Sequence, residues 1–173
     1  MFADERVFAR MTACGERNTA HEQRMALGRM GAPYDMYDIF DFTAVYKKYK
    51  AVLFLPGIQT AGVTAAEKLC AASGVPCRSL ADKKGLFTEG ELHDLCAESG
   101  VHLYCDAGDI VYINARYAAL HAVTGGEKTL RFPRPVTLTD LLDGAAPQRG
   151  KTVALPMNQG ETRLFAIEPL PDA

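Results

Sequence analysis

The stretch AVLFLP, residues 51–56, decides the fold class that we predict for this chain. Its apolar residues are continuous rather than alternating, which is typical of a strand that is covered on both faces. A strand of this kind needs helices on either side of its sheet. The flanking sequence contains start and stop signals for such helices.

Three sequences around this strand have the pattern of a capping box: TAHE (19–22), TAAE (64–67) and TEGE (88–91). In such a box the Thr hydroxyl accepts the amide of the third helical residue, and the Glu carboxylate reaches back to the Thr amide. Each expected helix is followed by a glycine at the place of a left-handed cap, namely Gly31, Gly74 and Gly100. These signals predict three helices.

Shorter apolar runs between the helices predict further strands at PYDMYDI (33–39), VPCRSL (75–80) and VHLYCD (101–106). Helices that alternate with short buried strands are typical of an α/β layered domain with a mostly parallel sheet. We therefore expect one such domain over residues 1–125.

The C-terminal third has a different pattern, which predicts a small antiparallel β appendage over residues 126–173. The segment EKTLRFPRPVTL (127–138) has strand residues but contains Pro133 and Pro135, so we expect an edge strand. The segments KTVALP and ETRLFAIEP flank MNQG (157–160), which predicts a hairpin loop.

Composition excludes several classes of protein. The 173 residues are 48% hydrophobic and carry a net charge of −2, which excludes a disordered chain and argues against nucleic-acid binding. The longest apolar stretch, residues 51–58, is far shorter than a membrane span. Acidic residues at positions 4 and 5 argue against a secretory signal. Five cysteines without CxxC spacing predict neither a disulfide framework nor a zinc knuckle, so we expect a cytoplasmic protein.

The richest polar cluster lies in VHLYCDAGDIVYIN, residues 101–114. One interpretation is a cysteine nucleophile, Cys105, that is activated by His102 or His121 and oriented by an aspartate. The other interpretation is a buried strand followed by a turn, because no helix N-terminus is expected beside Cys105 to lower the pKa of its thiol. A small autonomous hydrolase or ligand-binding module that uses Cys105 is therefore the alternative function.

Other site patterns are missing from the sequence. Asp106 and Asp109 are not followed by the ladder of oxygen ligands that a calcium loop requires, and they are better interpreted as turn residues. The four histidines have no zinc-ligand spacing: His21, His93, His102 and His121. The loop FLPGIQTAG (54–62) has neither a phosphate-binding motif nor a nucleophile elbow. We predict no catalytic, cofactor-binding or metal-binding residue.

Three stretches carry a family resemblance: RMGAPYDMYDIFDF (29–42), YKAVLFLPG (49–57) and the long run from AESGVHLYCDAGD to TLRFPRP (97–135). They resemble the β-galactosidase trimerisation domain, which follows the catalytic barrel in family 42 glycoside hydrolases and related uncharacterised glycoside hydrolases. The segment LLDG to LFAIE (141–168) is similar to the small β segment that closes such proteins. The resemblance implies a flavodoxin-like, class I glutamine amidotransferase-like three-layer sandwich.

The resemblance also implies a function without catalysis. The catalytic glutamates of those enzymes belong to the barrel, which needs about 250 residues. We therefore expect a non-catalytic structural or oligomerisation domain of a β-galactosidase-like protein, without a cofactor. Its expected partners are further copies of itself, as a trimer or a dimer, and the catalytic barrel of a parent hydrolase.

The implied topology makes one sharp prediction. In the strand order 2-1-3-4-5 the first strand lies between the second and the third. Those two strands fall at residues 34–38 and 51–55, so Met1–Asp4 should form a truncated central strand between them. A gap at this place would leave backbone groups of both neighbours unpaired, which costs about 1–3 kcal/mol for each buried group.

Overall fold

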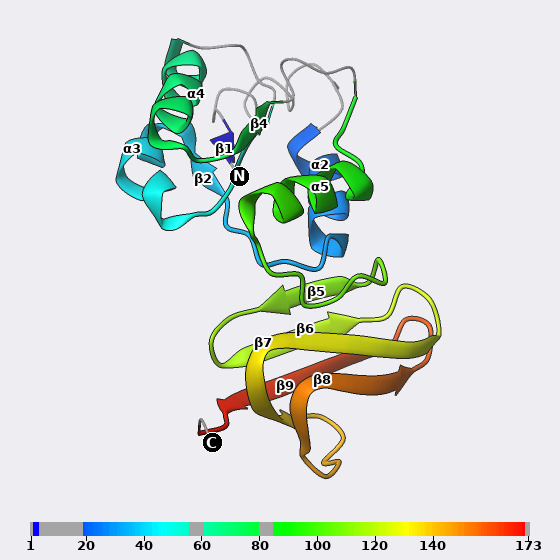
Figure 1. Ribbon diagram of the computed structural model, residues 1–173. Coiled ribbons are helices and arrows are strands. Elements are labelled where there is room, and N and C mark those ends of the chain that lie inside the picture. The colour runs from blue at the N-terminus through cyan, green and yellow to red at the C-terminus, as the bar shows by residue number, and fades with distance from the viewer. Residues whose placement is uncertain (1, 4–18, 56–60, 80–84, 172–173) are drawn as a thin grey trace. The chain divides into compact units, whose positions relative to one another are not determined.

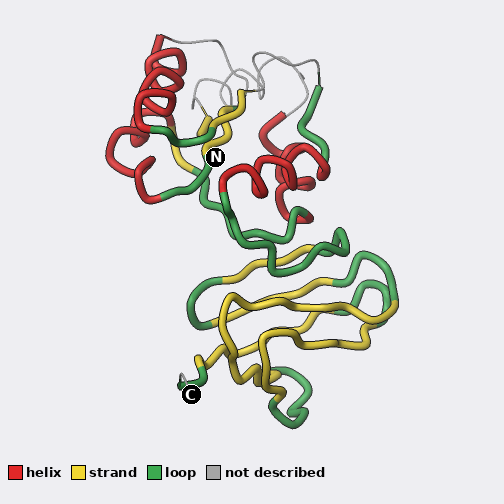
Figure 2. Tube along the Cα trace, viewed as in Figure 1, coloured by secondary structure: helices red, strands yellow, loops and turns green. Residues whose placement is uncertain are grey.

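The computed structural model describes residues 2–3, 19–55, 61–79 and 85–171, and the chain divides into two compact units (Figures 1 and 2). We call Met1–Ala26 with Tyr34–Val101 the parallel unit, and Leu27–Pro33 with His102–Ala173 the antiparallel unit. In the described part of the chain, none of the helices has the length and apolar character needed to cross a membrane.

The parallel unit contains a four-stranded sheet in the order β2-β1-β3-β4, with all neighbours parallel. Its strands are β1 (Phe2–Ala3), β2 (Tyr37–Asp38), β3 (Val52–Phe54) and β4 (Cys77–Ser79). Phe2 is in register with Tyr37 on one side and with Phe54 on the other. This confirms that the N-terminal residues form a short central strand between the two predicted neighbours.

The three predicted helices are present as α2 (Thr19–Arg29), α4 (Ala61–Ser73) and α5 (Glu89–Ser99). The Thr88 hydroxyl accepts from the Glu91 amide and the Glu91 carboxylate accepts from the Thr88 amide, so the third capping box is confirmed. The second box is wrong, because α4 begins at Ala61 and Thr64 lies inside the helix. The side chain of Thr19 and most of the loop at 54–62 lie outside the described residues.

Two 3₁₀ turns and one short helix connect β2 to β3: η1 (Ile39–Asp41), α3 (Phe42–Val45) and η2 (Tyr46–Lys48). The Asp38 side chain accepts from the Phe40 amide, which starts this segment. The Phe42 and Tyr46 rings stack with centroids 4.6 Å apart. Both rings pack with residues of β3 and α4 in one buried cluster. Figure 1 shows α3 and α4 on one side of the parallel sheet and α2 and α5 on the other.

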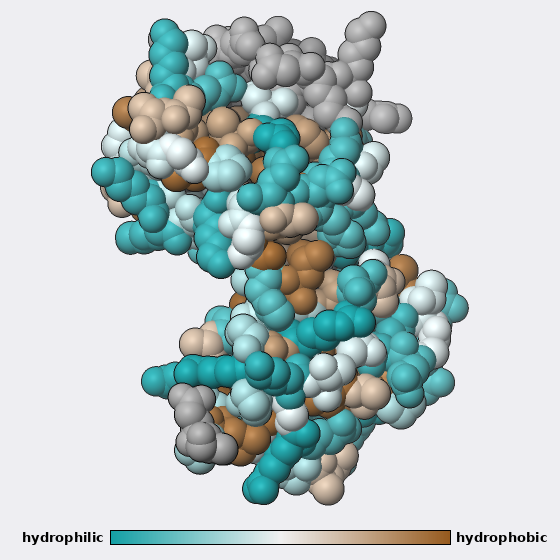
Figure 3. All heavy atoms as spheres, in the orientation of Figure 1, coloured by the Kyte–Doolittle hydropathy of each residue, from teal (hydrophilic) through white to brown (hydrophobic). Residues whose placement is uncertain are grey.

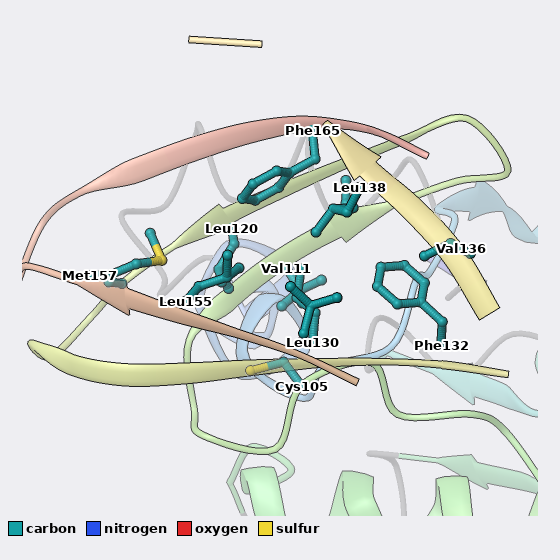
Figure 4. Close-up of a cluster of buried hydrophobic side chains, with 13 residues drawn as sticks. Cys105, Val111, Leu120, Leu130, Phe132, Val136, Leu138, Leu155, Met157 and Phe165 are labelled. Atoms are coloured by element: carbon teal, nitrogen blue, oxygen red, sulfur yellow. The ribbon is translucent and has the colours of Figure 1, made fainter. Parts of the chain in front are cut away.

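The antiparallel unit contains a five-stranded sheet in the order β5-β6-β9-β7-β8. Its strands are β5 (Ile110–Ile113), β6 (Tyr117–His121), β7 (Gly126–Asp140), β8 (Gln148–Met157) and β9 (Thr162–Pro169). Alternate residues of these strands point to one side and form a buried hydrophobic cluster (Figure 4). Leu120, Leu130 and Leu155 are among its fully buried members.

The predicted edge position of the proline-containing segment is wrong, because β7 lies between β8 and β9. The register with β8 shifts between Arg131 and Val136, and both prolines fall inside this irregularity. A bulge removes the ladder hydrogen bonds that a proline cannot make. The sheet therefore accommodates Pro133 and Pro135 in a central strand.

Two further predicted elements are also wrong. Residues 101–106 are not a strand, although the backbone of Tyr104 makes single hydrogen bonds to the backbone of Gly31 and of Arg131. The loop at 157–160 joins β8 to β9, but these strands flank β7 and do not form a hairpin with each other. Instead, Gly160 and Glu161 exchange backbone hydrogen bonds with Ala122 at the end of β6.

The expected flavodoxin-like sandwich with a mostly parallel sheet is therefore wrong for this chain. The parallel strands have only two or three residues each, whereas the antiparallel strands have four to fifteen. Most of the strand pairing in the described residues is antiparallel, because the strands from residue 110 onward pair with one another. This group includes β5 and β6. The antiparallel character expected for the C-terminal third is confirmed.

Candidate functional site

The polar segment around Cys105 is held in place by backbone contacts within the antiparallel unit. The Tyr104 amide donates to the Gly31 carbonyl at 2.7 Å, and the Arg131 amide donates to the Tyr104 carbonyl at 2.8 Å. Gly31 has a φ of +79°, and a Cβ atom there would lie 1.6 Å from the Cys105 carbonyl oxygen. Only glycine fits this close approach, so Gly31 does more than end a helix.

Cys105 itself lies in the hydrophobic core (Figure 4), where its exposed fraction is 1%. Burial is the main cause that raises the pKa of its thiol, and the negative charges of Asp109 and Asp106 raise it further. A backbone hydrogen bond from Ala107 and the charge of Lys128 act in the opposite direction. A buried thiol with a raised pKa is neutral at pH 7 and is a poor nucleophile.

The two histidines expected to activate Cys105 are engaged elsewhere. The His102 Nε2 atom lies 2.8 Å from the Arg131 carbonyl oxygen, and the imidazole ring contacts the Tyr104 ring edge-on. The His121 Nδ1 atom lies 2.8 Å from the Thr162 hydroxyl. His121 alternates with the buried residues Leu120 and Ala122, so it faces away from the core that contains the thiol. The structure brings neither histidine to Cys105.

The two aspartates have separate ion-pair partners. Asp106 binds Arg131 at 2.7 Å on the surface. Asp109 is buried with Lys128, whose Nζ atom lies 2.9 Å from Oδ2 and 3.1 Å from Oδ1. The Val123 amide also donates to Asp109 Oδ1, and Lys128 Nζ donates to the Thr124 hydroxyl. These bonds join the residue before β5 to the beginning of β7.

Lys128 was not predicted as a partner from the sequence, although a signal for it exists. Lys128 precedes the inward-facing Leu130 by two residues, and Asp109 precedes the inward-facing Val111 by two. The period of two in a strand places such residues on the same face. Extending both patterns backward would place one acid and one base in the core, where they have to pair.

A second polar cluster lies in the parallel unit and contains residues of the PYDMY motif. The Tyr49 hydroxyl donates to Asp35 Oδ2 at 2.5 Å and lies 2.7 Å from the Tyr37 hydroxyl. Burial and the hydrogen bond to Asp35 raise the pKa of Tyr49, so this hydroxyl stays protonated as a donor. The cluster ties β2 to Tyr49, which follows η2 and lies three residues before β3.

Another polar residue of the Cys105 segment lies in a turn. Asn114 accepts from the Arg116 and Tyr117 amides and so forms the turn between β5 and β6. Within the described residues, no group of three or more His, Cys, Asp or Glu side chains is arranged to hold a metal ion. In this segment, partners within the protein are therefore established for His102, Asp106, Asp109 and Asn114.

A comparison with solved structures found a partial similarity to a β-galactosidase. A crystal structure of β-galactosidase from Bacillus circulans sp. alkalophilus matches 45% of this chain and 12% of that chain, with 20% sequence identity and a TM-score of 0.32. No family model and no curated protein matches the chain. A similarity of this size assigns no activity, and we base the proposed function on the residues themselves.

Proposed function

We propose that this chain is a non-catalytic structural domain of a glycoside-hydrolase-like protein, and that it self-associates. The sequence motifs shared with the β-galactosidase trimerisation domain supply the family context. The observation that supports a structural role is that residues of these motifs make contacts that hold the fold together. Gly31 contacts the Cys105 backbone, Asp35 binds Tyr49, and Asp109 is buried with Lys128.

The position of Cys105 favours this function over an autonomous cysteine hydrolase. A nucleophilic cysteine needs access to substrate and a base within hydrogen-bond reach. Cys105 is buried, and no described histidine is hydrogen bonded to its thiol. The motif around Cys105 therefore fits a role in the packing of the antiparallel unit better than a role in catalysis.

A surface for self-association is available on the outer face of β5 and β6. Tyr112 and Tyr117 alternate with buried residues of their strands, so both point outward, and their exposed fractions are 56% and 49%. Their cross-strand partners are the small residues Ala119 and Ala166. Two exposed aromatic rings above small residues form an apolar surface that a second copy of the chain can cover. Figure 3 shows that hydrophobic areas do reach the surface of the antiparallel unit.

One pair of measurements on the purified full chain tests this function. We expect no turnover of nitrophenyl galactosides, and we expect light scattering to report a dimer or a trimer at micromolar concentration. Replacing both tyrosines, Tyr112→Ser with Tyr117→Ser, should shift the chain toward the monomer. Phe40→Ser is the matched control, because Phe40 is an exposed aromatic residue of the parallel unit.

Two outcomes would contradict the proposal. Specific turnover of a galactoside by the purified chain would overturn the absence of catalysis. A wild-type chain that stays monomeric, or a double variant that associates as strongly as Phe40→Ser, would overturn the proposed surface.

A further inference from the structure

Cys70 and Cys77 lie near each other in the parallel unit. The proposed function uses neither of these cysteines. Cys70 lies in the last turn of α4 and is completely buried, whereas Cys77 begins β4 and is half-buried. Cys77 packs against the buried cluster that contains Cys70. Each thiol also contributes to the pKa shift of the other, which agrees with this packing.

The backbone between Cys70 and Cys77 brings these two residues close together. Gly74 adopts a left-handed conformation with a φ of +67°, and the Val75 amide donates to the Cys70 carbonyl at 3.0 Å. This helix cap turns the chain back toward the sheet. The Val52 amide then donates to the Pro76 carbonyl at 3.0 Å, which places β4 beside β3.

The alternation of β4 explains why Cys77 faces α4. Its neighbour Arg78 forms an ion pair with Glu98 of α5. Because successive strand residues point to opposite faces, Cys77 points to the face that α4 covers. The segment from Cys70 to Cys77 has only eight residues, so the cap of α4 keeps the two residues near each other.

We propose that Cys70 and Cys77 form a redox couple that closes to an intrachain disulfide in the presence of a disulfide oxidant of the glutathione class. This inference is independent of the proposed function, because it rests on the parallel unit alone.

The reaction consists of two balanced exchanges. The Cys77 thiolate attacks one sulfur of oxidised glutathione, the glutathione S–S bond breaks, and one glutathione thiol leaves. The Cys70 thiolate then attacks the Cys77 sulfur of this mixed disulfide, and the second glutathione thiol leaves. The protein loses two protons and two electrons, and one oxidised glutathione becomes two reduced glutathiones.

Exposure and charge determine which thiol reacts first. Cys77 is the accessible partner, and the neighbouring Cys70 thiol and the charge of Arg78 act to lower the pKa of its thiol. Burial is the larger effect and raises the pKa of Cys77, as does Glu67. Burial also raises the pKa of Cys70 to about 12. Because the thiolate is the nucleophile, the oxidation rate should rise about tenfold per pH unit near neutral pH.

The test uses the full chain with Cys14→Ser, because Cys14 lies outside the described residues. We expect oxidised glutathione to produce a Cys70–Cys77 disulfide, identified by peptide mass spectrometry, that dithiothreitol reverses. Cys96 and Cys105 are buried internal controls and should remain free thiols. Cys70→Ser should trap a stable glutathione adduct on Cys77, whereas Cys77→Ser should protect Cys70.

Hydrogen exchange separates this result from a reaction of unfolded protein. The oxidised chain should exchange the amides at the end of α4 and in β4 more slowly than the reduced chain, with the remaining regions unchanged. Recovery of Cys77 only as a glutathione adduct in the Cys14→Ser chain would overturn the proposal. Oxidation of Cys96 or Cys105 at the rate of Cys77 would overturn it as well.

Discussion

The parallel unit and the antiparallel unit stabilise their sheets in different ways. In the parallel unit, strands of two or three residues depend on helices whose ends are set by local signals, such as the Thr88 cap and the left-handed Gly74 and Gly100. In the antiparallel unit, long strands enclose one hydrophobic cluster, and a buried ion pair and a close glycine contact join segments that are distant in sequence. Local signals therefore define the first unit, and nonlocal contacts define the second.

The largest expected loss of stability comes from a substitution at Gly31, which contacts a segment that is distant in sequence. Gly31 and Gly74 are both left-handed glycines that follow a helix, but only Gly31 faces another backbone segment. Gly31→Ala adds an overlap with the Cys105 carbonyl to the left-handed strain, so we expect a loss of about 4–5 kcal/mol. Gly74→Ala adds only the strain, about 1–2 kcal/mol. Hydrogen exchange with urea denaturation measures both losses.

The two variants should lose protection against hydrogen exchange in different units of the chain. Gly31→Ala should deprotect amides of β7 and β8, and Gly74→Ala should deprotect only the end of α4. Equal losses for the two variants would show that the approach of Gly31 to Cys105 contributes nothing to stability.

A smaller effect is expected at the buried ion pair. Lys128→Met leaves the Asp109 carboxylate buried with the Val123 amide as its remaining donor, and we expect a loss of about 3 kcal/mol. The double variant Asp109→Asn with Lys128→Met removes both charges and should recover most of this loss. Urea unfolding followed by tyrosine fluorescence is suitable, because the chain has no tryptophan.

The control for this cycle is a surface pair. Arg131→Met removes the partner of Asp106, and both of these side chains are well exposed, so the loss at this ion pair should stay below about 1 kcal/mol. A single Lys128→Met variant as stable as Arg131→Met would contradict the assigned role of the buried pair.

The same contrast explains which features could be predicted from the sequence. The three helices and β3 follow from caps and apolar runs, which are visible in short windows of sequence. The central position of β1 follows instead from the strand order that the family resemblance implies. The central position of β7 was missed because Pro133 and Pro135 exclude an ordinary central strand, and only the register shift reveals the bulge. The pairing of β5 and β6 with β9 depends on contacts between distant segments.

The candidate site was less predictable than the fold. The residue types around Cys105 are compatible with a nucleophile and its base, whereas the structure buries the thiol and gives His102 and His121 other partners. Strand alternation could have placed His121 outside the core and Lys128 inside it. The contact between Gly31 and Cys105 has no local signal, because a glycine after a helix already has a sufficient explanation as a cap.

The smallest expected effect tests the local signals of the parallel unit. Thr88 and Thr64 both begin a capping-box sequence, but only Thr88 lies at a helix start. Thr88→Ala removes the acceptor of the Glu91 amide, which should lower the free energy of unfolding by about 1 kcal/mol. Thr64→Ala replaces an exposed residue in the interior of α4, where alanine has the higher helix propensity, so stability should stay constant or rise by about 0.5 kcal/mol. Urea unfolding of the two variants under identical conditions measures the difference, and a loss at Thr64 equal to that at Thr88 would place a helix start at residue 64 after all.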